Sequence, residues 1–256
     1  MKRFTADFET STWLKDESFV WAWSLCEIGN TNNLRIGNTI ESFFDTIRKE
    51  YNPIILFHNL KFDGEFILYY LLKNGYEYTD KKERKSKTFS TLISDMGLFY
   101  QIEVYFEVGK KTRKVTFLDS LKVINQSVDQ IAITFNLPES KLSIDYNKPR
   151  KKGHILSNEE VEYIKNDVVI VAKAMDYLYS MGLSKMTAGS NALFEYRKII
   201  TNKRFEKMFP KIPYEYDKDI RQAYKGGFTY LNPKYEGIDV EEGEVLDVNS
   251  LYPSVR

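Results

Sequence analysis

The alternation of apolar and polar residues at the start of the chain predicts a β-strand. Phe4, Ala6 and Phe8 point to one side, whereas Asp7 and Glu9 point to the other. A period of two residues is typical of a half-buried strand, with one face on the core and one in solvent. Asp7 and Glu9 are therefore expected to share the polar face.

The hydrophobic pattern then predicts further strands and helices. Residues 19–28 and 34–37 are rich in β-branched and aromatic side chains, so we expect two strands that continue the first as a meander. Apolar residues recur at helical spacing over 39–51. A short apolar strand over 54–57 and a helix from about Asp63 to Gly75 follow.

The middle of the chain combines strands with two helices. Apolar runs broken by glycines over 88–124 predict strands and hairpin turns, and a helix is expected over 127–137. Ser157 and Glu160 have the spacing of a capping box at the start of a long helix, which Gly182 ends.

The pattern changes character near Lys185. Helical spacing continues at first, residues 210–216 are rich in turn formers, and residues 245–248 look like a strand. We expect two domains, over residues 1–186 and residues 187–256.

Composition and charge narrow the class of protein. The chain has 256 residues, of which 43% are hydrophobic and 15% aromatic, so it can bury a sizeable core. Its formal net charge is +1, so any nucleic-acid binding has to be local. A single cysteine, Cys26, excludes an intrachain disulfide. The sequence shows no apolar leader and no stretch of membrane-spanning length, which predicts a cytoplasmic protein with no membrane partner.

Three pairs of polar residues stand at spacings that put both members on one face of a strand or helix. The pairs are Asp7 with Glu9, Asn59 with Asp63, and Tyr163 with Asp167. Hydrolysis of a phosphodiester by two metal ions needs several carboxylates at one point, which these pairs can provide if they converge.

Each pair also has an ordinary explanation when it is taken alone. Asp7 and Glu9 fit a solvated strand face, and Asp167 fits an exposed helix position. Asn59 fits a helix cap, and the neighbouring His58 fits a structural histidine.

Taken together, the order and spacing of these three pairs resemble the exonuclease motifs of family B DNA polymerases. The resemblance is strongest to the protein-primed branch found in small tailed bacteriophages and linear plasmids. The exonuclease-type strings are Asp7-Phe8-Glu9-Thr10, Phe57-His58-Asn59-Leu60-Lys61-Phe62-Asp63-Gly64 and Tyr163-Ile164-Lys165-Asn166-Asp167. The resemblance continues through Asp119-Ser120-Leu121-Lys122, Met186-Thr187-Ala188-Gly189-Ser190, Tyr224-Lys225-Gly226-Gly227-Phe228 and Asp247-Val248-Asn249-Ser250-Leu251-Tyr252-Pro253. It covers essentially the whole chain.

The resemblance implies an α/β fold: a ribonuclease-H-like 3′→5′ exonuclease domain, with a mixed sheet flanked by helices, followed by the start of a polymerase palm. It implies two Mg²⁺ or Mn²⁺ ions at the exonuclease site, held by Asp7, Glu9, Asp63 and Asp167. Tyr163 would orient or activate the attacking water, and Lys141 would assist the same site by stabilising charge on the phosphate.

The resemblance also implies DNA contacts. The residues that match positions gripping a single-stranded 3′ end are Thr10, His58, Asn59, Phe62, Phe66, Ser120, Leu121 and Tyr146. Tyr224, Gly226 and Gly227 match a motif that contacts the template.

The string from Asp247 to Pro253 resembles the first of the polymerase motifs in this family. There Asp247 and the backbone of Val248 would bind metal, and Tyr252 would lie against the incoming nucleotide. A second aspartate cluster that polymerisation requires would follow Arg256, so we expect no polymerisation from this chain alone. The expected partners are single-stranded and primer-template DNA, with a dNTP and a terminal priming protein for the full-length protein.

Two other functions remain open: an inert module that only holds single-stranded DNA or the priming protein, and an independent ribonuclease-H-like nuclease. Two basic clusters, over 81–87 and 148–152, are candidates for phosphate contacts, although such clusters are also common in solvated loops.

Overall fold

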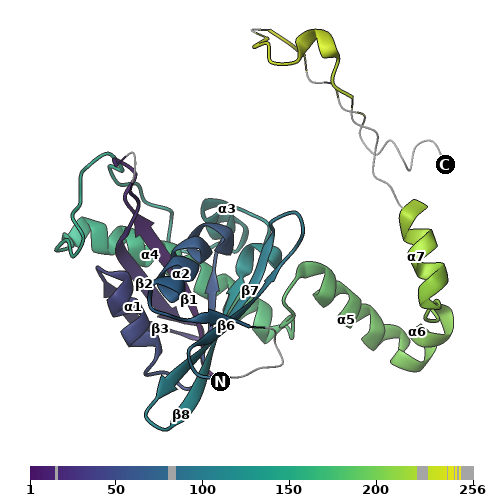
Figure 1. Cartoon of the computed structure of the whole chain (residues 1–256), viewed down its shortest axis with the longest axis horizontal. Coiled ribbons are helices and arrows are strands. Elements are labelled where there is room, and N and C mark those ends of the chain that lie inside the picture. The colour runs from purple at the N-terminus through teal and green to yellow at the C-terminus, as the bar shows by residue number, and fades with distance from the viewer. Residues whose placement is uncertain are drawn as a thin grey trace. The chain divides into compact units, whose positions relative to one another are not determined.

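The computed structural model describes residues 1–14, 17–79, 85–223, 230–240, 242–244, 246 and 248. The chain divides into two compact units, Met1–Thr201 and Asn202–Arg256, which we describe separately. The first unit holds all strands of the described residues and is built around one sheet (Figure 1).

The sheet has eight strands in the order β3-β2-β1-β4-β8-β7-β6-β5. β1, β4 and β8 run parallel to one another, whereas β1–β2–β3 and β6–β7–β8 are antiparallel, so the sheet is mixed. The predicted meander at the start of the chain is confirmed. The strands are β1 Arg3–Thr10, β2 Val20–Glu27, β3 Asn30–Gly37, β4 Ile54–Phe57, β5 Glu77–Tyr78, β6 Thr88–Ile93, β7 Phe99–Val108 and β8 Lys111–Asp119.

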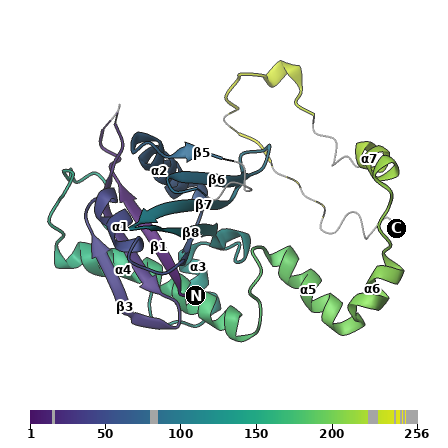
Figure 2. The ribbon, with the colours of Figure 1, turned by 60° about the horizontal axis from the view of Figure 1, so that its bottom comes forward.

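Helices cover both faces of this sheet (Figure 2). The core on one face joins Phe4 and Phe8 of β1 to side chains of α1 and α2, and the core on the other face joins Leu56 of β4 to side chains of α3 and α4. The predicted mixed sheet flanked by helices is therefore confirmed. The helices of this unit are α1 Ile40–Ile47, α2 Leu60–Lys73, η1 Ser120–Lys122, α3 Val128–Thr134, α4 Asn158–Ser180 and α5 Ala188–Ile200.

The prediction that β1 is half-buried is wrong. β1 lies in the middle of the sheet between β2 and β4, and α4 packs across the face that carries its polar residues. Thr5 is 1% exposed and Glu9 8% exposed, so the polar face of β1 is shielded from solvent as well. Two carboxylates on a covered strand require a special reason, because burying a charge is costly unless it is paired.

The starts of two helices have different causes: α4 begins at a local capping box, whereas the start of α2 depends on a contact with a distant residue. Ser157 and Glu160 form both bonds of the predicted capping box at the start of α4. α2 begins at Leu60, before the predicted start near Asp63. Asn59 precedes it with φ +77°, a left-handed conformation that asparagine tolerates, and its backbone N–H donates to Asp119 Oδ1 at the end of β8.

The second unit contains α6 Asn202–Met208, α7 Tyr214–Ala223 and η2 Pro233–Tyr235. Neither α6 nor α7 has a buried residue. The turn-rich segment predicted over 210–216 is shorter than expected, because Pro213 ends it and α7 begins directly afterwards. The division at Thr201 follows α5, whereas the domain boundary predicted after residue 186 precedes it; that boundary stays a prediction.

Several predictions for the polymerase motifs lie outside the described residues. These are Tyr224, Gly226, Gly227, Asp247 and Tyr252, together with the complete strand predicted over 245–248. Val248 is described, and its side chain is exposed. No helix of the described ranges combines the length and apolar character that crossing a bilayer would require.

Candidate active site

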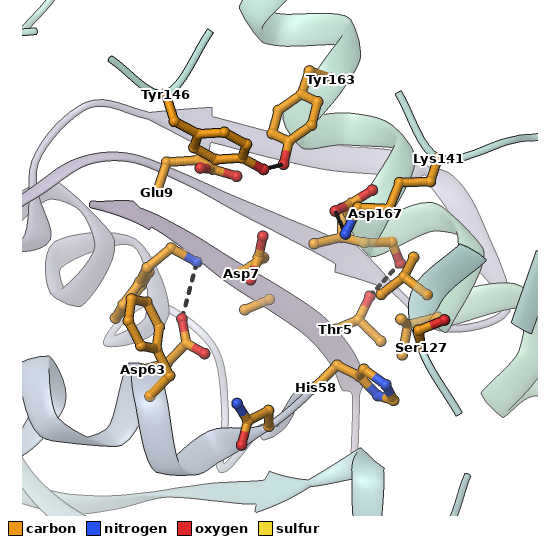
Figure 3. Close-up of a pocket in the computed structure, with 17 residues that line it drawn as sticks. Thr5, Asp7, Glu9, His58, Asp63, Ser127, Lys141, Tyr146, Tyr163 and Asp167 are labelled. Carbon is orange, nitrogen blue, oxygen red and sulfur yellow. Dashed lines mark hydrogen bonds and ion pairs between the residues drawn. The ribbon is translucent and has the colours of Figure 1, made fainter. Parts of the chain in front are cut away.

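A cavity of about 340 Å³ brings the three predicted motifs together (Figure 3). Its walls come from β1, from the turn before α2 and the first turn of α2, from the start of α3, from the segment between α3 and α4, and from α4 itself. The predicted site residues that line it are Asp7, Glu9, His58, Asn59, Phe62, Asp63, Lys141, Tyr146, Tyr163 and Asp167. Sequence positions as far apart as 7 and 167 thus contribute to one site.

Parallel strands explain why motifs so far apart in sequence meet. β1, β4 and β8 lie side by side and parallel, so their carboxyl ends lie at the same edge of the sheet. Asp7 and Glu9 lie in the second half of β1, His58 follows β4, and Asp119 ends β8. Ligands of sheets with parallel strands commonly bind at this edge.

Two hydrogen bonds hold the motifs in register. Thr5 Oγ1 donates to the carbonyl of Val168 at 2.8 Å and ties β1 to α4 beside Asp167. The backbone N–H of Phe8 donates to Asp63 Oδ1 at 3.1 Å and ties α2 to the strand between the first two carboxylates. Both bonds are buried, so the relative positions of the three motifs are well defined.

The segment between α3 and α4 contributes Lys141 and Tyr146 although it contains no helix or strand. Lys141 Nζ lies 3.7 Å from Asp167 Oδ2. The hydroxyls of Tyr146 and Tyr163 form a hydrogen bond. The predicted placement of Lys141 next to the carboxylates is therefore found in the structure.

The carboxylates are held in an environment that opposes their charge. Burial, followed by repulsion from Asp167, raises the pKa of Asp7 to about 7. Burial, followed by repulsion from Asp7 and Asp167, raises the pKa of Glu9 to about 9. The pKa values of Asp63 and Asp167 are raised by burial too, with Lys141 opposing the rise at Asp167. A bound cation would relieve this repulsion.

The donor set suits a hard divalent cation. Carboxylate oxygens are the ligands that Mg²⁺ and Mn²⁺ prefer. Asp167 Oδ1 is buried and has no hydrogen-bond partner in the structure, which leaves a lone pair free for a cation. Among the described residues no three acidic, histidine or cysteine side chains are grouped closely enough to hold an ion as they stand. The carboxylates instead lie around the cavity wall, with Lys141 beside Asp167.

His58 lines the cavity, but its ring is occupied by the protein. Nδ1 lies 3.0 Å from Ser120 Oγ, and Nε2 lies 2.7 Å from the carbonyl of Gln126. Burial lowers the pKa of His58. The structural explanation for His58 is therefore supported by these bonds, and Ser120, which is fully buried, holds the ring in place.

The remaining predicted DNA contacts fall into two groups. Phe62 and Tyr146 line the cavity and are half exposed. Thr10, Phe66 and Leu121 do not line it: Thr10 is buried at the end of β1, Phe66 lies next to Phe62 on α2, and Leu121 lies in η1. The alternative in which Asn59 caps α2 is not found, because its side chain makes no capping bond.

Three further residues shape the site, although the sequence did not indicate their roles. Thr5 is at the same strand face as Asp7 and Glu9, so its spacing was a usable signal. Ser127 caps α3 and lines the cavity. Asp119 accepts from the backbone N–H groups of Asn59 and Leu121, a role visible only once β8 is placed beside β4.

The basic cluster over 148–152 is only partly available to DNA. Arg150 is 3% exposed, and its Nε donates to Glu160 Oε1 at 2.7 Å. Its guanidinium lies 4.4 Å from the centre of the Trp21 ring. A phosphate contact through Arg150 is therefore wrong, whereas Lys148 and Lys151 are exposed. Residues 81–84 of the other cluster lie outside the described residues.

Comparison with known proteins agrees with the motifs. Residues 44–158 and 143–256 match the family described as DNA polymerase type B, organellar and viral. The DNA polymerase of Bacillus phage Nf is 45% identical over 254 residues, which are 99% of this chain and 44% of that protein. The DNA polymerase of Bacillus phage phi29 is 40% identical over the same shares.

A solved structure is similar as well. Phi29 DNA polymerase complexed with single-stranded DNA matches with a TM-score of 0.81 and 38% identity, over 91% of this chain and 41% of that chain. The chain thus spans less than half the length of these relatives. Because the family model matches well over half of the residues, and the phage relatives match 99% of the chain, this chain belongs to the type B DNA polymerases of organelles and viruses.

Proposed function

We propose that the cavity is the 3′→5′ exonuclease site of a protein-primed viral DNA polymerase. The observation that carries this proposal is the meeting of Asp7, Glu9, Asp63 and Asp167 from three elements at one cavity, beside Lys141 and Tyr163. Four carboxylates with raised pKa values, three of them buried, are costly to keep at one cavity, whereas a phosphodiesterase site requires such a group.

The four carboxylates would hold two Mg²⁺ or Mn²⁺ ions. When bound, these ions would supply a water of lowered pKa and would stabilise negative charge on the scissile phosphate. Asp167 is suited to this role through its free Oδ1, and Asp63 through its fixed position against β1.

Tyr163 and Lys141 would act on water and phosphate directly. Burial and the charge of Glu9 raise the pKa of Tyr163, so its hydroxyl stays protonated and can orient a water by hydrogen bonding. Its bond to Tyr146 fixes the position of that hydroxyl. The ammonium of Lys141, next to Asp167, would stabilise charge that develops on the phosphate oxygens.

The substrate that we propose is the single-stranded 3′ end of DNA. The phi29 structure described above was solved with single-stranded DNA, and a further one with primer-template DNA and incoming nucleotides. The exposed rings of Phe62 and Tyr146 at the cavity suit stacking against bases without regard to sequence. For the whole protein we propose primer-template DNA, a dNTP and a terminal priming protein as partners, with Asp247, Val248 and Tyr252 in the polymerisation site.

The direct test is metal-dependent digestion. With Mg²⁺ or Mn²⁺ the chain is expected to release labelled mononucleotides from 3′-labelled single-stranded DNA. EDTA is expected to abolish release, because it removes the ions that would activate the water and stabilise charge on the scissile phosphate. Nucleotide release is measured by gel analysis of the products, and DNA binding is measured in parallel by fluorescence anisotropy. Binding without release in either metal would contradict the proposal and favour the inert binding module.

A second prediction concerns Lys141. Replacing Lys141 by methionine keeps the length of the side chain but removes its charge, and we expect the turnover rate to fall about a hundred-fold. The affinity for single-stranded DNA should change much less. Lys165→Met is the matched control, since Lys165 lies on α4 in an ion pair with Glu162 and is equally exposed, at 41% against 40% for Lys141. Equal turnover in the two variants would exclude the role of Lys141.

A further inference from the structure

The outer face of α2 carries a row of aromatic side chains, of which the middle one, Phe66, is partly buried against the core and the other two are exposed. Phe62, Phe66 and Tyr69 recur at helical spacing, and Lys73 continues the row; we call these four residues the α2 stripe. Phe62 is 50% exposed and Tyr69 65% exposed. The rings of Phe62 and Phe66 are 5.7 Å apart, and Lys73 Nζ lies 5.6 Å from the centre of the Tyr69 ring.

Three hollows follow this stripe and share lining residues. The catalytic cavity includes Asn59 and Phe62. An adjoining hollow is lined by Asn59, Phe62 and Phe66 among others. Beyond it lies a second cavity, of about 290 Å³, whose lining includes Phe66, Tyr69 and Lys73. The stripe therefore leads without interruption from the catalytic cavity to a second cavity between α1 and α2.

The charges at the second cavity favour a phosphate on the α2 side. Lys73 forms no ion pair within the described residues. Lys152 is already paired with Glu41 at 2.9 Å, and Glu17 lines the same cavity from the loop before β2. A DNA backbone would thus be attracted to Lys73 on α2 and repelled by the carboxylates of the other walls.

The length of the stripe suits a short stretch of single strand. From Phe62 to Lys73 the helix rises about 16 Å at 1.5 Å per residue. Stacked bases are about 3.4 Å apart, so this length corresponds to a few nucleotides. Aromatic rings followed by a cation along such a track suit sequence-tolerant single-strand binding, which combines stacking on bases with contacts to phosphates.

We propose that Tyr69 and Lys73 bind the DNA single strand a few nucleotides upstream of the 3′ end that the catalytic cavity holds. Tyr69 stacks on a base, and Lys73 contacts a backbone phosphate. This inference rests on the proposed function, because that function places the 3′ end in the cavity and so fixes the direction of the strand along α2.

The test compares short and long oligonucleotides. Binding of dT3 and dT10 to the chain is measured by fluorescence anisotropy in EDTA, where no cleavage occurs. We expect Tyr69→Ala to weaken dT10 binding about 5- to 10-fold and to leave dT3 binding unchanged. Lys73→Ala should weaken dT10 binding and lower the slope of log affinity against log salt by about 0.7.

Controls separate stacking from general damage. Tyr69→Phe keeps a stacking ring and should bind dT10 like the wild type. Tyr51→Ala removes a ring that is 75% exposed and lies outside the stripe, and Lys218→Ala removes an exposed cation of α7; neither should change binding.

The inference is overturned if Tyr69→Ala leaves dT10 binding unchanged, or if it weakens dT3 and dT10 equally. Failure of the proposed function gives a different result, namely wild-type chain that releases no nucleotide with Mg²⁺ or Mn²⁺. DNA binding in EDTA can be measured whether or not the chain releases nucleotides.

Discussion

Replacing Asp7 and Glu9 together by alanine is expected to lower nucleotide release from single-stranded DNA by at least about a thousand-fold. The variant loses two of the four carboxylates at the cavity, and groups that act as one catalytic unit fail together. Release of labelled mononucleotides over time measures the effect. Affinity for DNA in EDTA should be kept or improved, because two carboxylates that repel phosphate are removed.

The same variant should be at least as stable as the wild type. Burial, followed by repulsion from Asp167, raises the pKa of Asp7 to about 7. Burial, followed by repulsion from Asp7 and Asp167, raises the pKa of Glu9 to about 9, so both groups favour the protonated form on folding. As the pH rises above the unfolded pKa values of about 4, the burial of these two groups therefore lowers the free energy of unfolding, and it does so increasingly until the pH passes their folded pKa values of about 7 and about 9. Glu77→Ala with Asp95→Ala, at exposed positions away from the cavity, is the matched control. Undiminished release in the Asp7 and Glu9 variant would refute the proposed site.

Replacing Arg150 by leucine is expected to lower the free energy of unfolding by about 3–5 kcal/mol. Arg150 and Glu160 form a buried ion pair, and removing one partner leaves a buried charge uncompensated. Urea denaturation measures the change. Lys152→Leu is the control, because the ion pair of Lys152 with Glu41 is about half exposed and should contribute less than about 1 kcal/mol.

Acid sensitivity gives this prediction a second measurement. Hydrogen bonds from Ser157, Arg150 and His154 outweigh the effect of burial and lower the pKa of Glu160 to about 2 from 4.5. A carboxyl with a lowered pKa stabilises the fold above its unfolded pKa, and this contribution, about 3 kcal/mol, is lost as the pH falls from about 4.5 to 2. In Arg150→Leu the loss over this range should be clearly smaller. An unchanged acid profile would show that Arg150 does not set the pKa of Glu160.

Arg150 also links stability to the candidate site. Its Nη1 donates to the carbonyls of Asp145 and Lys148, in the segment that carries Lys141 and Tyr146. This segment has no regular structure of its own, so its position depends on such anchors. Arg150→Leu is accordingly expected to slow nucleotide release even at temperatures where the variant stays folded.

Patterns that repeat locally were predicted well from the sequence. The capping box at Ser157 and Glu160 and the strand around Asp7 depend on neighbours within a few residues, and both are found in the structure. The pairs Asp7 with Glu9 and Tyr163 with Asp167 were predicted because strand and helix periods decide which residues share a face.

Features that depend on distant partners were not predicted. We predicted β1 to be half-buried because the sequence near it does not reveal that α4 covers its polar face. The start of α2 is set by Asp119, which is sixty residues away from Asn59. In the sequence Arg150 looks like one more cation of the basic cluster over 148–152. Only its contacts with Glu160 and Trp21 show that it is buried.

The bond between Thr5 and Val168 has a consequence for the order of events during synthesis. It joins residues 163 positions apart. At about 5–20 residues per second, α4 leaves the ribosome roughly 10–30 s after β1. Throughout this interval Asp7 and Glu9 remain hydrated, because no helix has yet covered them. The candidate site is therefore incomplete on the nascent chain until α4, the last helix on the second face of the sheet, has been made.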